Sequence, residues 1–160
     1  MTLPRQKDID ALLALVGWDK IVWDGSTLHF PLAGMEIDFG GIVKEYAADR
    51  AAALCESMSM SHGMINLGGD IKIIGSHTDL SPWQIGIRDP RDKHVVSSVV
   101  PLHSGAMASS GDYERCIDIE GKRYGHILNP KTGWPVQFFA SITVISDFCC
   151  LLYTSDAADE

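Results

Sequence analysis

The chain has 160 residues, enough for one hydrophobic core. Hydrophobic residues make up 46% and charged residues 21%, a globular composition that excludes a disordered chain. The formal net charge of −8 argues against a nucleic-acid surface, which needs a basic stripe. No apolar run reaches the length of a membrane span. Residues 1–17 carry acids early, which is unlike a signal peptide.

The first predicted element is a helix over residues 6–16, where apolar residues recur at helical spacing: Ile9, Leu12, Leu13 and Val16. Residues 20–30 predict a hairpin with Asp24-Gly25 at its tight turn, because glycine tolerates positive φ. Residues 35–39 predict a short strand. After Gly40-Gly41, an alanine-rich segment predicts a helix from about Ile42 to Met58. Its expected buried side consists of Ile42, Tyr46, Ala53 and Leu54.

The remainder of the chain is predicted to be mostly β. Turn signals separate eight expected strands. These cover residues 63–67, 70–75, 83–89, 95–102, 105–110, 114–120, 122–128 and 140–146. The expected class is α+β, with helices near the N-terminus packed on a largely antiparallel sheet. No repeat or domain linker is present in the sequence.

The four cysteines are Cys55, Cys116, Cys149 and Cys150, and none has zinc-site spacing. We expect buried or inert thiols. Residues 150–160, CLLYTSDAADE, show no clear periodicity and resemble a translated transposase-type sequencing adapter. We therefore expect residues 1–149 to form a partial domain and residues 150–160 to be a non-native tail, with the native chain continuing differently after Cys149.

Residues 38–44, DFGGIVK, combine a predicted strand end, two glycines and a helix start. Glycines let a ligand approach the backbone, and a helix N-terminus presents free N–H groups to an anion. Lys44 lies where it can reach a phosphate. The alternative is a simple strand-to-helix turn with a solvated lysine.

Two further glycine-containing segments have weaker signals. In residues 66–70, NLGGD, the glycines suggest a tight bend against a ligand, and Asn66 and Asp70 offer hydrogen-bonding groups. A plain hairpin turn is the alternative. Residues 108–115, ASSGDYER, form a small polar loop in which Tyr113 has a ring that can stack on a flat ligand. A surface turn is the alternative there.

Residues 124–136, YGHILNPKTGWPV, place His126 at a predicted strand end before a loop rich in proline and glycine. The ordinary pKa of histidine suits proton transfer near neutrality. A lone histidine is more often structural than catalytic. The sequence lacks a nucleophile elbow, a Walker loop, an HExxH motif and a GxGxxG motif.

The four segments DFGGIVKEYAADRAA, INLGGDI, ASSGDYER and RYGHILNPKTGWPV occur in that order. They resemble the conserved blocks of the ApbE family, the FAD:protein FMN transferases. The resemblance runs from about residue 8 to residue 149. It implies an enzyme that uses FAD as substrate with Mg²⁺, attaches FMN to a Ser or Thr hydroxyl of a target flavoprotein, and releases AMP.

The resemblance also implies site residues. His126 matches the family's candidate base, and Gly41 matches a metal contact that must be made by its backbone carbonyl. The positions that match flavin-nucleotide contacts or line that site are Asp38, Lys44, Gly68, Gly69, Asp70, Ser110, Asp112, Tyr113, His126 and Ile127. Family members carry an acidic and a hydroxyl residue after the last strand here, where the adapter-like tail stands. We therefore expect weak Mg²⁺ binding and little activity from the 160-residue chain.

Three other functions stay open at this point. The same residues would serve FAD hydrolysis to FMN and AMP, a flavin-binding protein without chemistry, or an α+β domain of another role. The family implies a cell-envelope location with a lipoprotein anchor that this chain does not contain. The chain itself carries no targeting evidence.

Overall fold

The computed structural model describes residues 2–92, 94–113 and 115–151. The chain forms two compact units and passes between them three times. One unit contains Met1–Asp38 and Asp112–Phe139, and the other contains Phe39–Gly111 and Ala140–Glu160. Each unit is described by itself below.

A four-stranded antiparallel sheet forms the centre of the second unit, in the order β10-β7-β4-β3. Its strands are β3 (Gly63–Leu67), β4 (Asp70–Gly75), β7 (Gly105–Gly111) and β10 (Ser141–Ser146). Gly68 and Gly69 alone connect β3 to β4, and both have positive φ, 67° and 103°. That is the backbone of a two-residue hairpin turn, which explains glycine at both positions.

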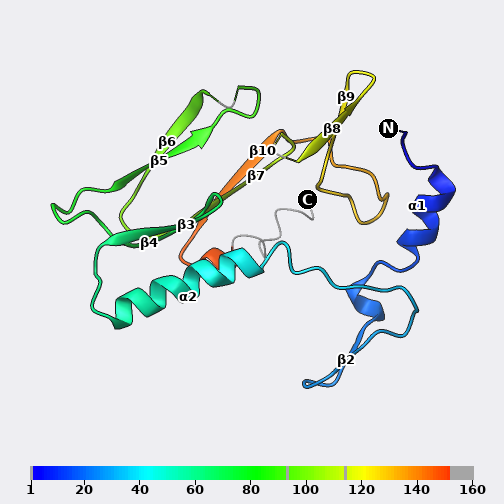
Figure 1. Ribbon diagram of the computed structural model, residues 1–160, viewed down its shortest axis with the longest axis horizontal. Helices are drawn as coiled ribbons and strands as arrows, with labels where there is room; N and C mark the ends of the chain where they lie inside the picture. Colours follow the sequence, from blue (N-terminus) through cyan, green and yellow to red (C-terminus); the bar gives the residue numbers. More distant parts are fainter. Residues whose placement is uncertain (1, 93, 114, 152–160) are drawn as a thin grey trace. The chain divides into compact units, whose positions relative to one another are not determined.

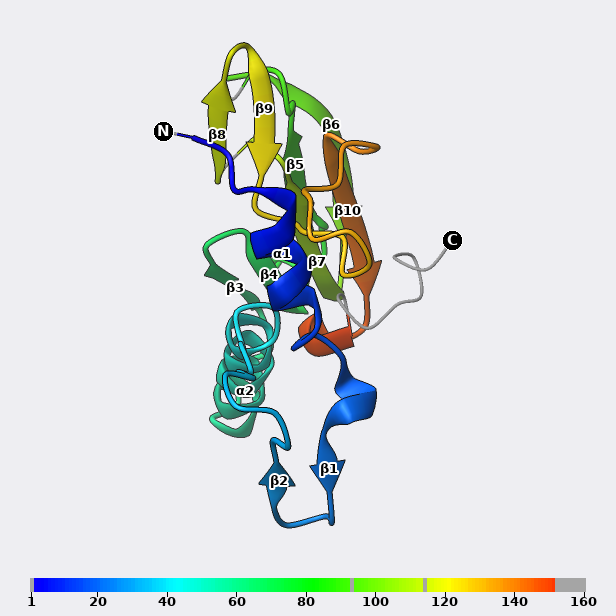
Figure 2. The same ribbon diagram turned by 90° about the vertical axis from the view of Figure 1, so that its right-hand side faces the viewer.

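Helix α2 (Val43–Ser57) packs on one face of this sheet, beside β3 and β4 in both views (Figures 1 and 2). The buried contact is made by small side chains: Ala48, Ala106, Ala108 and Cys149. The expected buried side of α2 is wrong, because Ile42, Tyr46 and Leu54 are 44%, 58% and 62% exposed and Ala53 is also exposed. Alanine lets the helix backbone come close to the sheet, so the buried face is the one with Ala48 and Ala52.

The opposite face of the sheet packs against the antiparallel pair β5 (Trp83–Arg88) and β6 (Val96–Leu102). Side chains of β7 contribute to the packing on both faces of the sheet, because successive side chains point to opposite faces of a strand. Ala106 and Ala108 belong to the cluster with α2, while Met107 belongs to the cluster on the other face. The second core consists of Ile71, Ile73, Ile85, Leu102 and Met107.

The segment after β10 is fixed to α2 and β4 by several contacts. Asp49 of α2 accepts hydrogen bonds from the backbone N–H groups of Cys149, at 3.0 Å, and Cys150, at 2.9 Å. These residues begin the short 3₁₀-helix η2 (Cys149–Leu151). Lys72 donates to the Asp147 carbonyl and lies 4.9 Å from the centre of the Phe148 ring. Contacts from α2 and β4 therefore fix the segment that follows β10.

The first unit contains shorter elements. They are α1 (Gln6–Leu13), the 3₁₀-helix η1 (Trp18–Lys20), the pair β1 (Val22–Trp23) and β2 (Leu28–His29), and the pair β8 (Cys116–Ile119) and β9 (Lys122–Gly125). The predicted hairpin is present, but the tight turn at Asp24-Gly25 is wrong, because residues 24–27 together connect β1 to β2. The Asp24 carboxylate accepts the backbone N–H groups of Ser26 and Thr27, which lowers the pKa of Asp24.

The predicted strand over residues 35–39 is wrong. This segment is extended or irregular, and no strand in the described part of the chain pairs with it. Ile37 and Phe39 are 40% and 53% exposed. Alternating apolar residues form a strand only when a neighbouring strand accepts their backbone hydrogen bonds.

Both predicted helices and all eight other predicted strands are present, with ends moved by a few residues. The α+β class with antiparallel sheets is confirmed. No described helix combines the length and apolarity needed to cross a bilayer.

Candidate functional site

The second unit brings Lys44 and Asp70 together at the start of α2. Asp70 is the first residue of β4 and is only 2% exposed. Its carboxylate pairs with the Lys44 ammonium, whose side chain is half exposed. A buried carboxylate needs a charged or hydrogen-bonding partner, so Asp70 holds Lys44 in place. The Lys44 side chain is 50% exposed at this position.

The predicted glycine positions lie next to open space. A Cβ added at Gly41, Gly68 or Gly69 would meet no atom within 4 Å. At Gly68 and Gly69 the positive φ of the hairpin turn explains glycine, and the Asn66 side chain accepts the Gly69 N–H at 2.9 Å. At Gly41 the φ is not positive, so neither the backbone nor packing requires glycine. Close approach of a ligand to the backbone would require glycine at this position.

Glu45 is a buried acid that sequence reasoning missed. It lies in the first turn of α2 and is 1% exposed, and its Oε2 has no hydrogen-bond partner. A sequence signal exists in the spacing of Glu45, Ala48 and Ala52, which places the acid on the alanine face that packs on the sheet. The unsatisfied oxygen needs a physical explanation.

The first unit holds Asp112 and Tyr113 directly after β7, both half-buried. A Cβ on Gly125 would lie 3.2 Å from the Asp112 Cβ, so the two segments pass closely because residue 125 is glycine. Arg123 Nη1 lies 4.0 Å from Asp112 Oδ1, which is buried without a hydrogen-bond partner. Asp112 is thus an acid held beside β9 with one oxygen unsatisfied.

His126 follows β9 and is exposed. Its Nδ1 lies 3.3 Å from the Arg115 carbonyl oxygen. A carbonyl only accepts hydrogen bonds, so Nδ1 carries the proton in this contact and Nε2 of the neutral ring keeps its lone pair. The geometry therefore leaves Nε2 able to accept a proton from a ligand.

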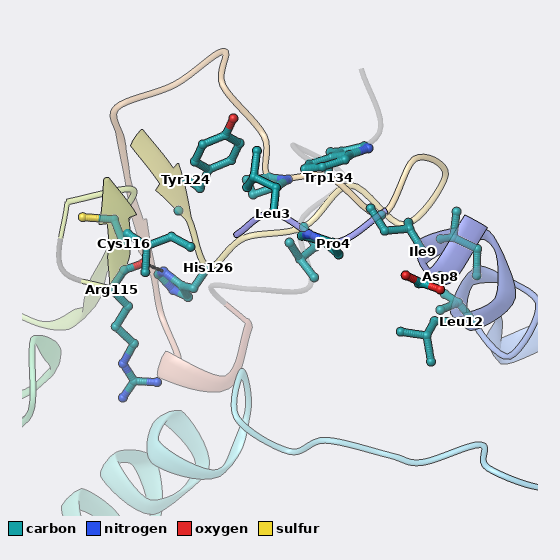
Figure 3. Close-up of a pocket in the computed structure, with 17 residues that line it drawn as sticks. Leu3, Pro4, Asp8, Ile9, Leu12, Arg115, Cys116, Tyr124, His126 and Trp134 are labelled. Atoms are coloured by element: carbon teal, nitrogen blue, oxygen red, sulfur yellow. Dashed lines mark hydrogen bonds between the residues drawn. The ribbon is translucent and has the colours of Figure 1, made fainter. Parts of the chain in front are cut away.

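A cavity of about 700 Å³ borders His126 in the first unit (Figure 3). The predicted apolar face of α1 lines it, together with residues of β8, β9 and the loop that follows His126. Trp134 Nε1 donates to Gln6 Oε1 at 2.9 Å, and a Cβ on Gly133 would lie 2.4 Å from Ile9 Cγ2. The loop and α1 are therefore closely packed at this cavity.

Three further predicted site residues are Ser110, Asp38 and Ile127. Ser110 is half-buried near the end of β7, opposite Ile142 of β10. Asp38 is exposed before α2, and Ile127 is 39% exposed after His126. The structure thus brings together Lys44 with Asp70, and Asp112 with the strand that leads to His126.

Within the described residues, no group of three or more His, Cys, Asp or Glu side chains is placed to hold a metal ion. The cysteines in this part of the chain are free: Cys149 is buried, Cys55 and Cys150 are half-buried, and Cys116 is exposed.

Comparison with known proteins identifies the family to which the chain belongs. The family model described as "ApbE family" matches residues 1–159. The chain belongs to the ApbE family. A relative from Haemophilus influenzae, named FAD:protein FMN transferase, is 35% identical over 150 residues, covering 89% of this chain and 43% of the relative. One of the same name from Rhodobacter capsulatus is 34% identical, covering 98% of this chain and 30% of that protein.

Solved ApbE structures have the same fold. The crystal structure of the ApbE protein from Thermotoga maritima aligns with a TM-score of 0.87 and 37% identity, covering 95% of this chain and 50% of that one. The apo flavinyl transferase ApbE from Pseudomonas stutzeri aligns with a TM-score of 0.80 and 31% identity, covering 94% and 47%. The chain therefore spans half or less of the length of these relatives.

Proposed function

We propose that this chain is the part of an FAD:protein FMN transferase that supplies the proton-accepting base and one group of phosphate-binding residues. A Ser or Thr hydroxyl of the target protein attacks the FMN-side phosphorus of FAD. A new O–P bond forms, the bond from that phosphorus to the AMP oxygen breaks, and FMN stays on the target as a phosphoester. Membership of a family whose relatives bear this name supports the reaction class.

The observation that carries the catalytic step is the orientation of His126. A hydroxyl is a weak nucleophile until a base accepts its proton. The contact from Nδ1 to the Arg115 carbonyl leaves Nε2 to accept that proton. His126 Nε2 is thus the proposed base, and it passes the proton to solvent or to AMP as the leaving group departs.

Binding of the nucleotide is assigned to the remaining predicted residues. Lys44, which pairs with Asp70, is the proposed contact to the pyrophosphate. The backbone beside Gly41 and the Gly68-Gly69 turn has room for close approach. The proposed contacts with the rest of FAD come from Asp38, Ser110, Asp112, Tyr113 and Ile127.

Mg²⁺ fits the N-terminal turn of α2 in two respects. The space beside Gly41 is open, and Glu45 has a carboxylate oxygen without a partner. When bound, the ion would offset negative charge on the pyrophosphate. Gly41 would hold it through the backbone carbonyl.

FAD hydrolysis is the second candidate, and one observation favours it. His126 is exposed, so water has access to the ring as an acceptor hydroxyl would. In that reaction water replaces the target hydroxyl, and the products are FMN and AMP.

The test uses a chimera, because the chain spans about half of the matched Thermotoga maritima protein. Residues 1–149 replace the matching part of that protein, and the chimera is incubated with FAD, Mg²⁺ and an acceptor protein that carries a Ser/Thr flavinylation segment. We expect a flavin-fluorescent band on the denatured acceptor, lost in His126→Ala and kept in His29→Ala. Free FMN without a labelled acceptor would favour hydrolysis, and unchanged FAD would contradict both reactions.

A further inference from the structure

The starting point is the unsatisfied carboxylate of Glu45. The residue is 1% exposed, and Oε2 contacts no hydrogen-bond donor. Burying a carboxylate oxygen without a partner costs free energy, because the oxygen loses its water and gains nothing in return. Such an atom in a folded protein is commonly completed by a water molecule, a ligand group or an ion.

The neighbouring cations are engaged elsewhere. Lys44 pairs with Asp70. Lys72 donates to the Asp147 carbonyl and lies over the Phe148 ring. These contacts do not involve the Glu45 carboxylate.

Glu45 is one of three acids whose charges act on the buried Cys149 thiol. Burial raises the pKa of the Cys149 thiol to about 12, and the charges of Asp49, Asp70 and Glu45 add to this effect, while Lys72 opposes it. A site whose acids outnumber its bases attracts a cation.

The direction of the side chain is also favourable. In an α-helix the Cα–Cβ bond tilts toward the N-terminus, so Glu45 leans toward the turn that contains Gly41, one helical turn earlier. A Cβ at Gly41 would meet no atom within 4 Å, which leaves room beside that backbone. The orphaned oxygen and the open backbone thus belong to the same end of α2.

We propose that Glu45 supplies a carboxylate ligand to a divalent cation of the Mg²⁺ class bound at the N-terminal turn of α2. Mg²⁺ commonly uses one or two carboxylates and takes its remaining ligands from water and phosphate oxygens. That coordination explains how one acid serves, although no group of three metal-binding side chains exists in the described residues. The ion accounts for the buried charge, and the nucleotide phosphates complete its ligand shell.

This inference deepens the proposed function, so its test measures ion binding alone. Mn²⁺, used as a spectroscopic substitute for Mg²⁺, is titrated into the 160-residue chain and followed by electron paramagnetic resonance, with and without ADP. We expect weak saturable binding that tightens with ADP. Glu45→Gln should raise the Kd by about tenfold or more, as removal of a carboxylate near a metal commonly does. Glu56→Gln is the matched control, because Glu56 lies on the same helix and is exposed.

Folding is checked in the same variants. Without metal, Glu45→Gln should melt at the same temperature as the unmodified chain or higher, because an unpaired buried charge is removed. Mg²⁺ should raise the melting temperature of the unmodified chain and of Glu56→Gln but not of Glu45→Gln. Equal Mn²⁺ affinity in Glu45→Gln and the unmodified chain, or no saturable Mn²⁺ binding with ADP present, would overturn the proposal. Neither result depends on FMN transfer.

Discussion

The ion pair between Lys44 and Asp70 joins the first turn of α2 to the first residue of β4. The two residues are 26 positions apart, and the pair fixes a half-exposed cation over a buried acid. The helix start, the β3–β4 turn and the proposed phosphate contact are thereby held as one corner. The pair therefore joins the two glycine-containing segments, residues 38–44 and 66–70.

Breaking this pair should affect stability and binding differently. Lys44→Met leaves the Asp70 carboxylate buried without its cation, and we expect a loss of about 1–3 kcal/mol in the free energy of unfolding. The double variant with Asp70→Asn should recover part of that loss, since no unpaired buried charge remains. FAD binding, measured by fluorescence titration, should stay weak in both, because both lack the Lys44 ammonium. Normal FAD affinity in the double variant would remove Lys44 from the site.

Asp49 is expected to anchor the segment after β10. Asp49→Ala removes the acceptor of two backbone N–H groups, so we predict a loss of about 1–3 kcal/mol and faster amide exchange at Cys149 and Cys150. Asp49→Asn keeps one acceptor oxygen, so its stability should lie between those of Asp49→Ala and the unmodified chain. Urea denaturation and hydrogen exchange measure these effects. Unchanged exchange at both amides in Asp49→Ala would show that the carboxylate does not fix this segment.

The contact between α1 and the loop after His126 depends on glycine at position 133. A Cβ there would lie 2.4 Å from Ile9 Cγ2, and the residue has φ of +71°. Gly133→Ala should therefore cost about 1–3 kcal/mol more than Gly121→Ala. Gly121 has a similar φ, +74°, but its Cβ would meet nothing within 4 Å, so it isolates the clash from the backbone strain. Equal melting temperatures for the two variants would contradict the packing described for this unit.

Cys149 makes stability depend on alkaline pH. The folded thiol has a pKa raised from 9.0 to about 12, chiefly by burial. Between these values the unfolded thiol loses its proton while the folded thiol keeps it, so the free energy of unfolding falls as pH rises from 9 toward 12. Cys149→Ala, compared with the unmodified chain by denaturation across this range, should show a smaller fall. In the native chain iodoacetamide should modify exposed Cys116 well before Cys149. Equal slopes with pH in both chains would contradict the raised value.

The strands and the helix positions followed from periodicity and turn chemistry, because a pair such as Gly68-Gly69 marks a tight turn locally. The buried face of α2 did not follow, since the large apolar side chains of Tyr46 and Leu54 outweighed the small ones of Ala48 and Ala52 in the pattern. The close packing of the helix backbone on the sheet favours the face with small side chains, and that packing is a tertiary feature.

Part of the candidate site was equally visible in sequence. His126, Lys44 and the glycines stand out because their residue types suit proton transfer and phosphate binding. The spacing of Glu45 with Ala48 and Ala52 is a sequence signal for its burial, but its meaning depends on which helix face packs on the sheet. The two hydrogen bonds of Asp49 were not visible, because the donors in η2 lie 100 and 101 residues away in sequence. Acids on an alanine-rich helix otherwise suggest a solvated surface.

The most direct test of the account is product analysis of the chimera that carries residues 1–149. FAD is supplied in known amount, the acceptor protein is examined by intact mass spectrometry, and AMP and FMN are quantified by chromatography. The account predicts an acceptor heavier by FMN less one water, an equal amount of AMP and little free FMN. Both the mass increase and the AMP should be lost in His126→Ala. AMP and free FMN with an unmodified acceptor, or full transfer by His126→Ala, would contradict the assignment of His126 as the base of a protein FMN transferase.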